Sequence, residues 1–82
     1  MSMTYYVALP FVEDVDGALT AGQAQECPTA PSAIRRAEAM ARDPKHAGAL
    51  AFQRSGDPSL GRFGDATLLK SFGIVPDRLE EF

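Results

Sequence analysis

Hydrophobic residues alternate with other residues near the start of the chain. In Thr4–Val12, TYYVALPFV, every second residue is Tyr, Val, Leu or Phe, and this alternation of β-branched and aromatic residues is typical of a β-strand. Pro10 has no N–H to donate to a neighbouring strand, which predicts an edge position or a bulge there. The dipeptide Asp16-Gly17 favours a tight turn, so we expect a hairpin whose second strand lies within Ala18–Cys27.

The segment Thr29–Asp43 has the period of an amphipathic helix. Five apolar residues share one face, namely Ala33, Ile34, Ala37, Met40 and Ala41. Thr29 or Ser32 is expected to cap the N-terminus, and Asp43 precedes Pro44, which ends the helix. Because the buried stripe is mostly alanine, we expect the helix to lie close to a sheet whose Tyr, Leu and Phe residues fill the core.

The chain after the helix continues the strand pattern. Ala47–Arg54 is predicted to be a third strand, and Ser55–Asp65 a turn followed by a long loop. Ala66–Phe72 alternates like a strand but also fits a short helix ending at Gly73. We interpret it as a fourth strand, because the outer edge of the third would otherwise stay open. Residues 77–82 are expected either to add a helical turn that packs on the sheet or to fray.

These elements predict a single α+β domain over residues 1–82. The expected architecture is a small antiparallel sheet of three to four strands with one main helix packed on one face, in β-β-α-β-β order. A chain of 82 residues supports one core. Its expected stability is about 4 to 12 kcal/mol, and burying further apolar surface in a dimer is one way to raise it.

Charge is distributed unevenly along the chain. Residues 1–34 contain four carboxylates and no Lys or Arg, whereas the middle of the chain is basic. Six basic residues there are the candidate binding residues: Arg35, Arg36, Arg42, Lys45, Arg54 and Arg62. They form either a solvated surface that keeps the domain in solution or a patch for an anion, a nucleic-acid backbone or an acidic partner. A pI of about 4.9 counts against general nucleic-acid binding.

No residue cluster in the sequence indicates an enzyme, a metal site or a cofactor site. Cys27 and His46 flank the predicted helix and would lie roughly 20 Å apart, so we expect no nucleophile–base pair. The acidic turn lacks the further oxygen ligands of a calcium loop. Four aromatic residues, Tyr5, Tyr6, Phe52 and Phe63, could stack on bases, although aromatic residues in short strands are more typical of a core.

The sequence therefore predicts a small soluble, non-enzymatic module whose open sheet face or edge binds a protein partner or a second copy of itself. The alternative is a nucleic-acid or anion-binding domain that uses the basic helix face. A single cysteine fits a reducing, cytoplasmic setting. We expect no signal peptide, because no basic region precedes the first apolar run. We also expect no membrane span, because no apolar run approaches the ~20 residues required.

Overall fold

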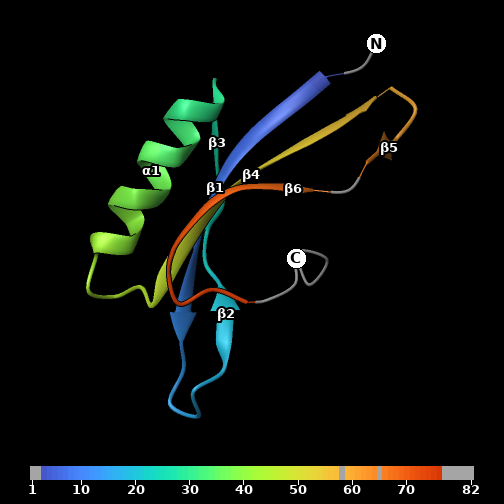
Figure 1. Ribbon diagram of the computed structural model, residues 1–82. Helices are drawn as coiled ribbons and strands as arrows, with labels where there is room; N and C mark the ends of the chain where they lie inside the picture. The colour runs from blue at the N-terminus through green and yellow to red at the C-terminus, as the bar shows by residue number, and fades with distance from the viewer. Residues whose placement is uncertain (1–2, 58, 65, 77–82) are drawn as a thin grey trace.

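The computed structural model describes residues 3–57, 59–64 and 66–76, and it shows one helix against a curled antiparallel sheet (Figure 1). The elements are β1 (Met3–Glu13), β2 (Leu19–Ala21), β3 (Gln25–Cys27), α1 (Ala30–Arg42), β4 (Gly48–Asp57), β5 (Arg62–Phe63) and β6 (Thr67–Gly73). Strands β1 and β4 form the centre, β2 and β3 pair with β1, and β5 and β6 pair with β4. The predicted α+β class is confirmed. The sheet of the described residues has six strands, more than the three to four expected.

The central pair of strands defines the two faces of the sheet. β1 and β4 are antiparallel over nine residue pairs, from Met3 opposite Gly56 to Phe11 opposite Gly48. Because successive side chains of a strand point to opposite faces, Ala8 and Ala51 lie on one face. The residues next to them, such as Leu9 and Leu50, lie on the other.

Pro10 explains why the second strand of the hairpin is divided into β2 and β3. The carbonyl of Pro10 accepts a hydrogen bond from Gly22 N at 2.8 Å, so the side of Pro10 that lacks an N–H faces this neighbouring segment. The segment next to β1 therefore pairs with it before Pro10, as β3, and after Pro10, as β2, but forms no regular pair with Pro10 itself. Gly22 allows close approach, because a Cβ there would lie 3.1 Å from Pro10 Cγ. The predicted edge position for Pro10 is therefore wrong, because β1 is a central strand, and the interruption lies in the neighbouring segment and not in β1.

The helix begins and ends where the sequence predicts. Thr29 is the N-cap, with its Oγ1 accepting from Ser32 N at 3.2 Å, and Ser32 Oγ accepts from Thr29 N at 3.0 Å. This reciprocal pair satisfies two of the N–H groups that a helix start leaves unpaired. Asp43 is the C-cap and is followed by Pro44, which cannot continue a helix.

Helix α1 packs on the sheet through alanine on both sides. Ala33 and Ala37 of the helix contact a cluster that contains Ala8, Ala49 and Ala51, and all five are fully buried. Larger residues surround this contact: Tyr6, Ile34, Met40, Leu69 and Phe72. The expectation that strand Tyr, Leu and Phe residues would fill the space under the helix is therefore wrong at its centre, where methyl groups meet methyl groups.

The large strand residues form a second cluster on the opposite face. Leu9, Phe11 and Leu50 are buried there, and Leu19, Phe52 and Val75 pack against them. Val75 reaches this face because the chain turns at Gly73, which has a φ of +71°, and crosses over the start of β4. A Cβ on Gly48 would collide with the backbone of Ile74, so this crossing requires glycine at position 48.

The chain after α1 contains more β-strand than the sequence predicts. Ala66–Phe72 is a strand, as predicted, and forms most of β6, with a register shift that leaves Leu69 as an extra residue. Strand β4 continues to Asp57, and β5 lies within the predicted Ser55–Asp65 loop. The prediction for residues 77–82 lies outside the described residues.

Ala37→Leu tests the alanine contact. We expect the substitution to lower the free energy of unfolding by about 1 to 3 kcal/mol, because the added carbons have no space between helix and sheet. Ala39→Leu is the matched control on an exposed position of the same helix and should change stability by less than about 0.5 kcal/mol. Urea unfolding followed by circular dichroism measures both, and equal stabilities would contradict the close packing.

Candidate interaction surface

Four strands of the sheet contribute to a part that extends beyond the helix. The start of β1, the end of β4, all of β5 and the start of β6 form this extension, which we call the arm and which points away from α1 (Figure 1). In the arm, Met3 lies opposite Gly56, and Gly56 lies opposite Phe63. The arm therefore has two faces that α1 does not cover.

The two faces of the arm differ in polarity. The face on the helix side carries polar residues, listed from the strand registers as Thr4, Gln53, Ser55, Asp57, Arg62 and Thr67, and Thr4 Oγ1 lies 2.9 Å from Ser55 Oγ. The opposite face carries mainly apolar residues, which we call the open face: Met3, Tyr5, Val7, Arg54, Phe63 and Leu68. The arm is therefore amphipathic although it has no second layer of secondary structure.

The apolar side chains of the open face lie close together and remain accessible. The rings of Tyr5 and Phe63 are 6.0 Å apart at an angle of 48°, a tilted arrangement that is favourable for aromatic pairs. Gly56 permits this contact, because a Cβ there would collide with the Phe63 ring. Met3, Phe63 and Leu68 are 48%, 50% and 46% exposed.

Arg54 is the charged residue of the open face, which Glu26 of β3 borders on the same side of the sheet, opposite Val7. It lies opposite Tyr5 and is half-buried. Its Nε is buried and makes no hydrogen bond in the described part of the chain. A buried donor without an acceptor costs roughly 1 to 3 kcal/mol, so Nε is a cost to the fold, and only the accessible part of the guanidinium group can donate to a second molecule.

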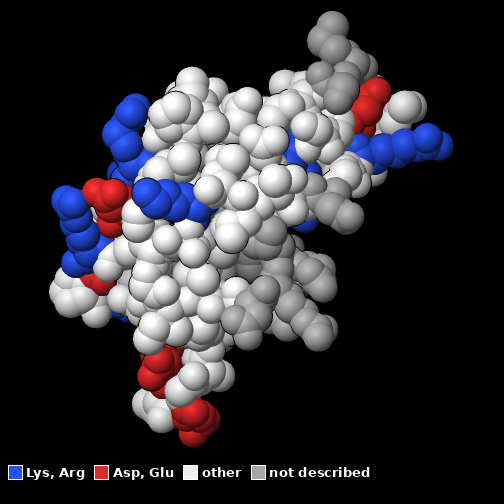
Figure 2. All heavy atoms as spheres, viewed as in Figure 1, with Lys and Arg blue, Asp and Glu red and all other residues white. Residues whose placement is uncertain are grey.

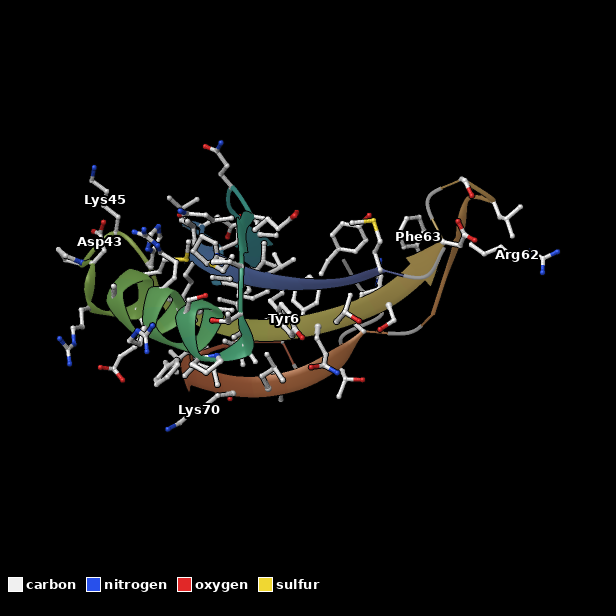
Figure 3. The ribbon with its side chains drawn as sticks, turned by 90° about the horizontal axis from the view of Figure 1, so that it is seen from above. Tyr6, Asp43, Lys45, Arg62, Phe63 and Lys70 are labelled. Carbon is white, nitrogen blue, oxygen red and sulfur yellow. The ribbon has the colours of Figure 1, made fainter. Side chains whose placement is uncertain are left out.

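The structure does not bring the six predicted basic residues together. Arg35, Arg36 and Arg42 lie on α1, and Lys45 lies just after it, at one end of the molecule (Figure 3). Arg62 lies at the opposite end, on β5 (Figure 3). Arg54 lies on the sheet face opposite α1. The predicted patch is therefore divided among three places.

The basic residues on α1 are themselves not equivalent. Arg42 Nη2 donates to Glu38 Oε1 at 2.8 Å, one turn earlier in the helix, and such exposed pairs contribute only about 0.3 to 0.5 kcal/mol. Arg35 and Arg36 are exposed and border a shallow depression of about 280 Å³ that Ser32 and Ala39 complete. The basic side chains along α1 are visible in Figure 2.

Cys27 and His46 have separate structural roles. Cys27 is half-buried and packs at the rim of the alanine cluster. His46 is half-buried in the loop between α1 and β4, and its Nδ1 lies 2.7 Å from the Met40 carbonyl. It therefore caps one of the last carbonyls of α1.

The turn after β4 is ordered by Asp57. Its Oδ1 accepts from the Ser59 hydroxyl at 2.6 Å and from Ser59 N at 3.0 Å. These hydrogen bonds, with the Ser59 hydroxyl the largest cause, hold the pKa of the Asp57 carboxyl below its ordinary value. The turn positions β5 so that Phe63 returns to the open face.

Sequence reasoning identified part of the open face and missed part. Tyr5, Phe52 and Phe63 were candidates for stacking, and the structure places them on one side of the sheet and Tyr6 on the other. Met3 and Leu68 were not considered as surface residues. The alternation in Thr4–Val12 continues back to Met3 and could have indicated it, whereas Leu68 depends on the bulge in β6.

Arg54→Met tests whether the buried Nε is a cost to the fold. We expect the free energy of unfolding to rise by roughly 1 kcal/mol, because an apolar chain of similar length replaces an unpaired buried donor. Arg36→Met, at an exposed helix position, should leave stability within about 0.5 kcal/mol. Thermal and urea unfolding measure the difference. A loss of stability in Arg54→Met would show that Arg54 supports the fold.

Comparisons with known proteins identify no relative of this chain. No protein-family model matches the chain, and no curated protein or solved structure is significantly similar to it. Within the described residues, no helix is long and apolar enough to cross a membrane. In the same residues, no three His, Cys, Asp or Glu side chains gather as they would around a metal ion.

Proposed function

We propose that this protein is a non-enzymatic interaction module that binds another protein through the open face. The observation that carries the proposal is the amphipathic arm, whose apolar side holds Met3, Phe63 and Leu68 about half exposed. An arm surrounded only by water would gain nothing from keeping these residues on one side, whereas a partner would bury them. A cytoplasmic location, expected from the single cysteine, belongs to the same proposal.

The residue types of the open face are those typical of protein interfaces. Interfaces are enriched in aromatic residues, Met and Arg and depleted in Lys, Glu and Asp. The open face contains Tyr, Phe, Met and Arg, and one carboxylate, Glu26 of β3, borders it opposite Val7. Arg and Tyr are also among the residues that most often dominate binding energy. The open face therefore fits a protein partner better than it fits a nucleic-acid backbone.

The sheet edges are less suited to binding than the open face. On one side, β2 and β3 are three residues each and are separated beside Pro10. On the other side, β6 contains the irregularity at Leu69 and an exposed Lys70. Short strands, bulges and lysine are features that prevent pairing between sheet edges. We therefore assign binding to the face and not to strand addition.

Phe63→Ser combined with Leu68→Ser tests the open face. The immobilised full chain should retain proteins from an extract of the source cells, and the double variant should lose them because about half of the exposed apolar surface is removed. Leu60→Ser is the matched control, since Leu60 is 66% exposed but lies in the turn before β5. Quantitative mass spectrometry compares the three samples. Proteins retained equally by all three would contradict the proposal.

A second candidate function is anion or nucleic-acid binding by α1. The observation that favours it is the pair of exposed guanidinium groups of Arg35 and Arg36 beside the depression on the helix. Arginine side chains at the surface can bind phosphate oxygens through two parallel hydrogen bonds. This candidate uses neither Arg54 nor Arg62, which lie elsewhere.

Titration with mixed-sequence DNA and RNA at low salt tests the second candidate. Binding through α1 should weaken at least about tenfold in Arg35→Ala with Arg36→Ala, and it should fall with rising salt because counterions are released from the phosphates. Arg62→Ala is the control, because Arg62 lies at the far end of the molecule. Fluorescence anisotropy reports the affinity, and the absence of any binding would eliminate the candidate.

A further inference from the structure

The open face specifies the chemistry of its partner. Its apolar residues require apolar contact, and the accessible part of the half-buried Arg54 side chain offers a charged hydrogen-bond donor. The nearest carboxylate at a described strand position on this side of the sheet is Glu26, which borders the face opposite Val7, and Arg54 lies one strand further on, opposite Tyr5. A fitting partner therefore presents an exposed apolar side chain next to one or more carboxylates.

The turn between β1 and β2 has this composition. We call Glu13, Asp14, Val15 and Asp16 the acidic turn. Val15 is 102% exposed between two aspartates, and red carboxylates gather at this end of the molecule in Figure 2. A fully exposed valine at the tip of a turn contributes nothing to the core of its own chain.

The acidic turn is also preorganised. Asp14 Oδ1 accepts from Asp16 N at 2.8 Å and from Ala18 N at 3.0 Å, and Gly17 N donates to Asp14 O at 3.0 Å. Asp14 is thus used to hold the turn, whereas Glu13 and Asp16 make no side-chain hydrogen bond within the described residues. Binding such a turn costs little ordering entropy.

Strand β1 keeps the acidic turn away from the open face of the same chain. Met3 and Tyr5 lie at the start of β1, and Glu13 is its last residue. Ten residue steps at the rise of a strand span roughly 30 Å. The acidic turn can therefore reach an open face only on another molecule.

We propose that the open face of one copy binds the acidic turn of a second copy. Val15 of the second copy contacts Phe63 and Leu68 of the first, and Glu13 or Asp16 accepts hydrogen bonds from the Arg54 guanidinium. This inference rests on the proposed function and names the partner of the same surface. Because the two contacting surfaces differ, each bound copy still has one free surface, and association continues head to tail.

The experiment uses two full-length variants with complementary defects. The turn variant carries Val15→Ser and Asp16→Lys, and the face variant carries Arg54→Glu and Leu68→Ser. Each alone should self-associate at least about tenfold more weakly than the wild type, because a charged contact across the interface becomes repulsive. A mixture of the two should form a one-to-one dimer, because the intact open face of the turn variant binds the intact acidic turn of the face variant, whereas the two remaining surfaces lack Leu68 and Val15. Sedimentation velocity from low to high micromolar concentration measures the masses.

Two control variants carry the same charge changes elsewhere. Glu38→Lys changes an accessible carboxylate of α1, and Arg36→Glu changes an exposed arginine of the same helix; both should associate like the wild type. Circular dichroism and thermal unfolding verify that every variant is folded. Wild-type association should also weaken with added salt, because an exposed ion pair is screened.

Three results would overturn the inference. The first is a wild type that remains monomeric throughout, and the second is a mass that stops at a dimer, which indicates a two-fold contact of identical surfaces. The third is a turn variant that associates like the wild type. If the face variant nevertheless loses proteins captured from the cell extract and the turn variant keeps them, the proposed function stands and only the second copy is excluded as its partner.

Discussion

The methyl-to-methyl packing of α1 on the sheet is the constraint on which the rest of the structure depends. Ala33 and Ala37 meet strand alanines, so the helix lies too close to the sheet for larger side chains at the centre. The alternation of β1 and β4 then places leucine and phenylalanine on the opposite face. The protein consequently has two small apolar clusters on either side of one sheet, and not one layer of large residues beneath a helix.

Element lengths then determine which surface stays open. α1 has 13 residues and spans about 20 Å, whereas β1 has 11 residues and spans roughly 30 Å or more. The helix covers only part of β1, and the uncovered start of the strand belongs to the arm, whereas its last residues pair with β2. On the opposite face, the turn at Gly73 and the crossing over Gly48 bring Val75 onto the cluster of Leu9, Phe11 and Leu50. That segment packs on the inner part of the face, and the outer part forms the open face.

Local features of the fold could be predicted from the sequence, whereas contacts between strands could not. The caps of α1 and the strand character of Thr4–Val12 depend on neighbouring residues, so their patterns were sufficient. The division of β2 from β3 depends on which side of Pro10 faces its neighbour, and this follows from register. Register also decides that strand alanines face the helix, which the composition of the strands alone does not state.

In the candidate site, too, local features could be predicted from the sequence and contacts between strands could not. The charge pattern suggested one basic patch, but residues 54 and 62 are brought to other surfaces by strand pairing, which sequence spacing does not encode. The open face could be predicted only where a single strand carries it, as in Met3, Tyr5 and Val7. Phe63 and Leu68 join it through β5 and β6, and their contribution depends on the turn at Asp57 and the irregularity at Leu69.

On the proposed function, Arg54 would make the open face more selective than the apolar residues alone could make it. A surface of Met, Val, Leu and Phe alone would bind almost any exposed apolar patch, because apolar contact has no direction. A partner without an acceptor would complete the burial of the Arg54 guanidinium without a hydrogen bond, which costs several kcal/mol for a charged group. On the proposed function, Arg54 would therefore disfavour purely apolar partners and favour acidic ones. The preference would come from the accessible part of the guanidinium group, while the buried, unpaired Nε concerns the stability of the chain itself.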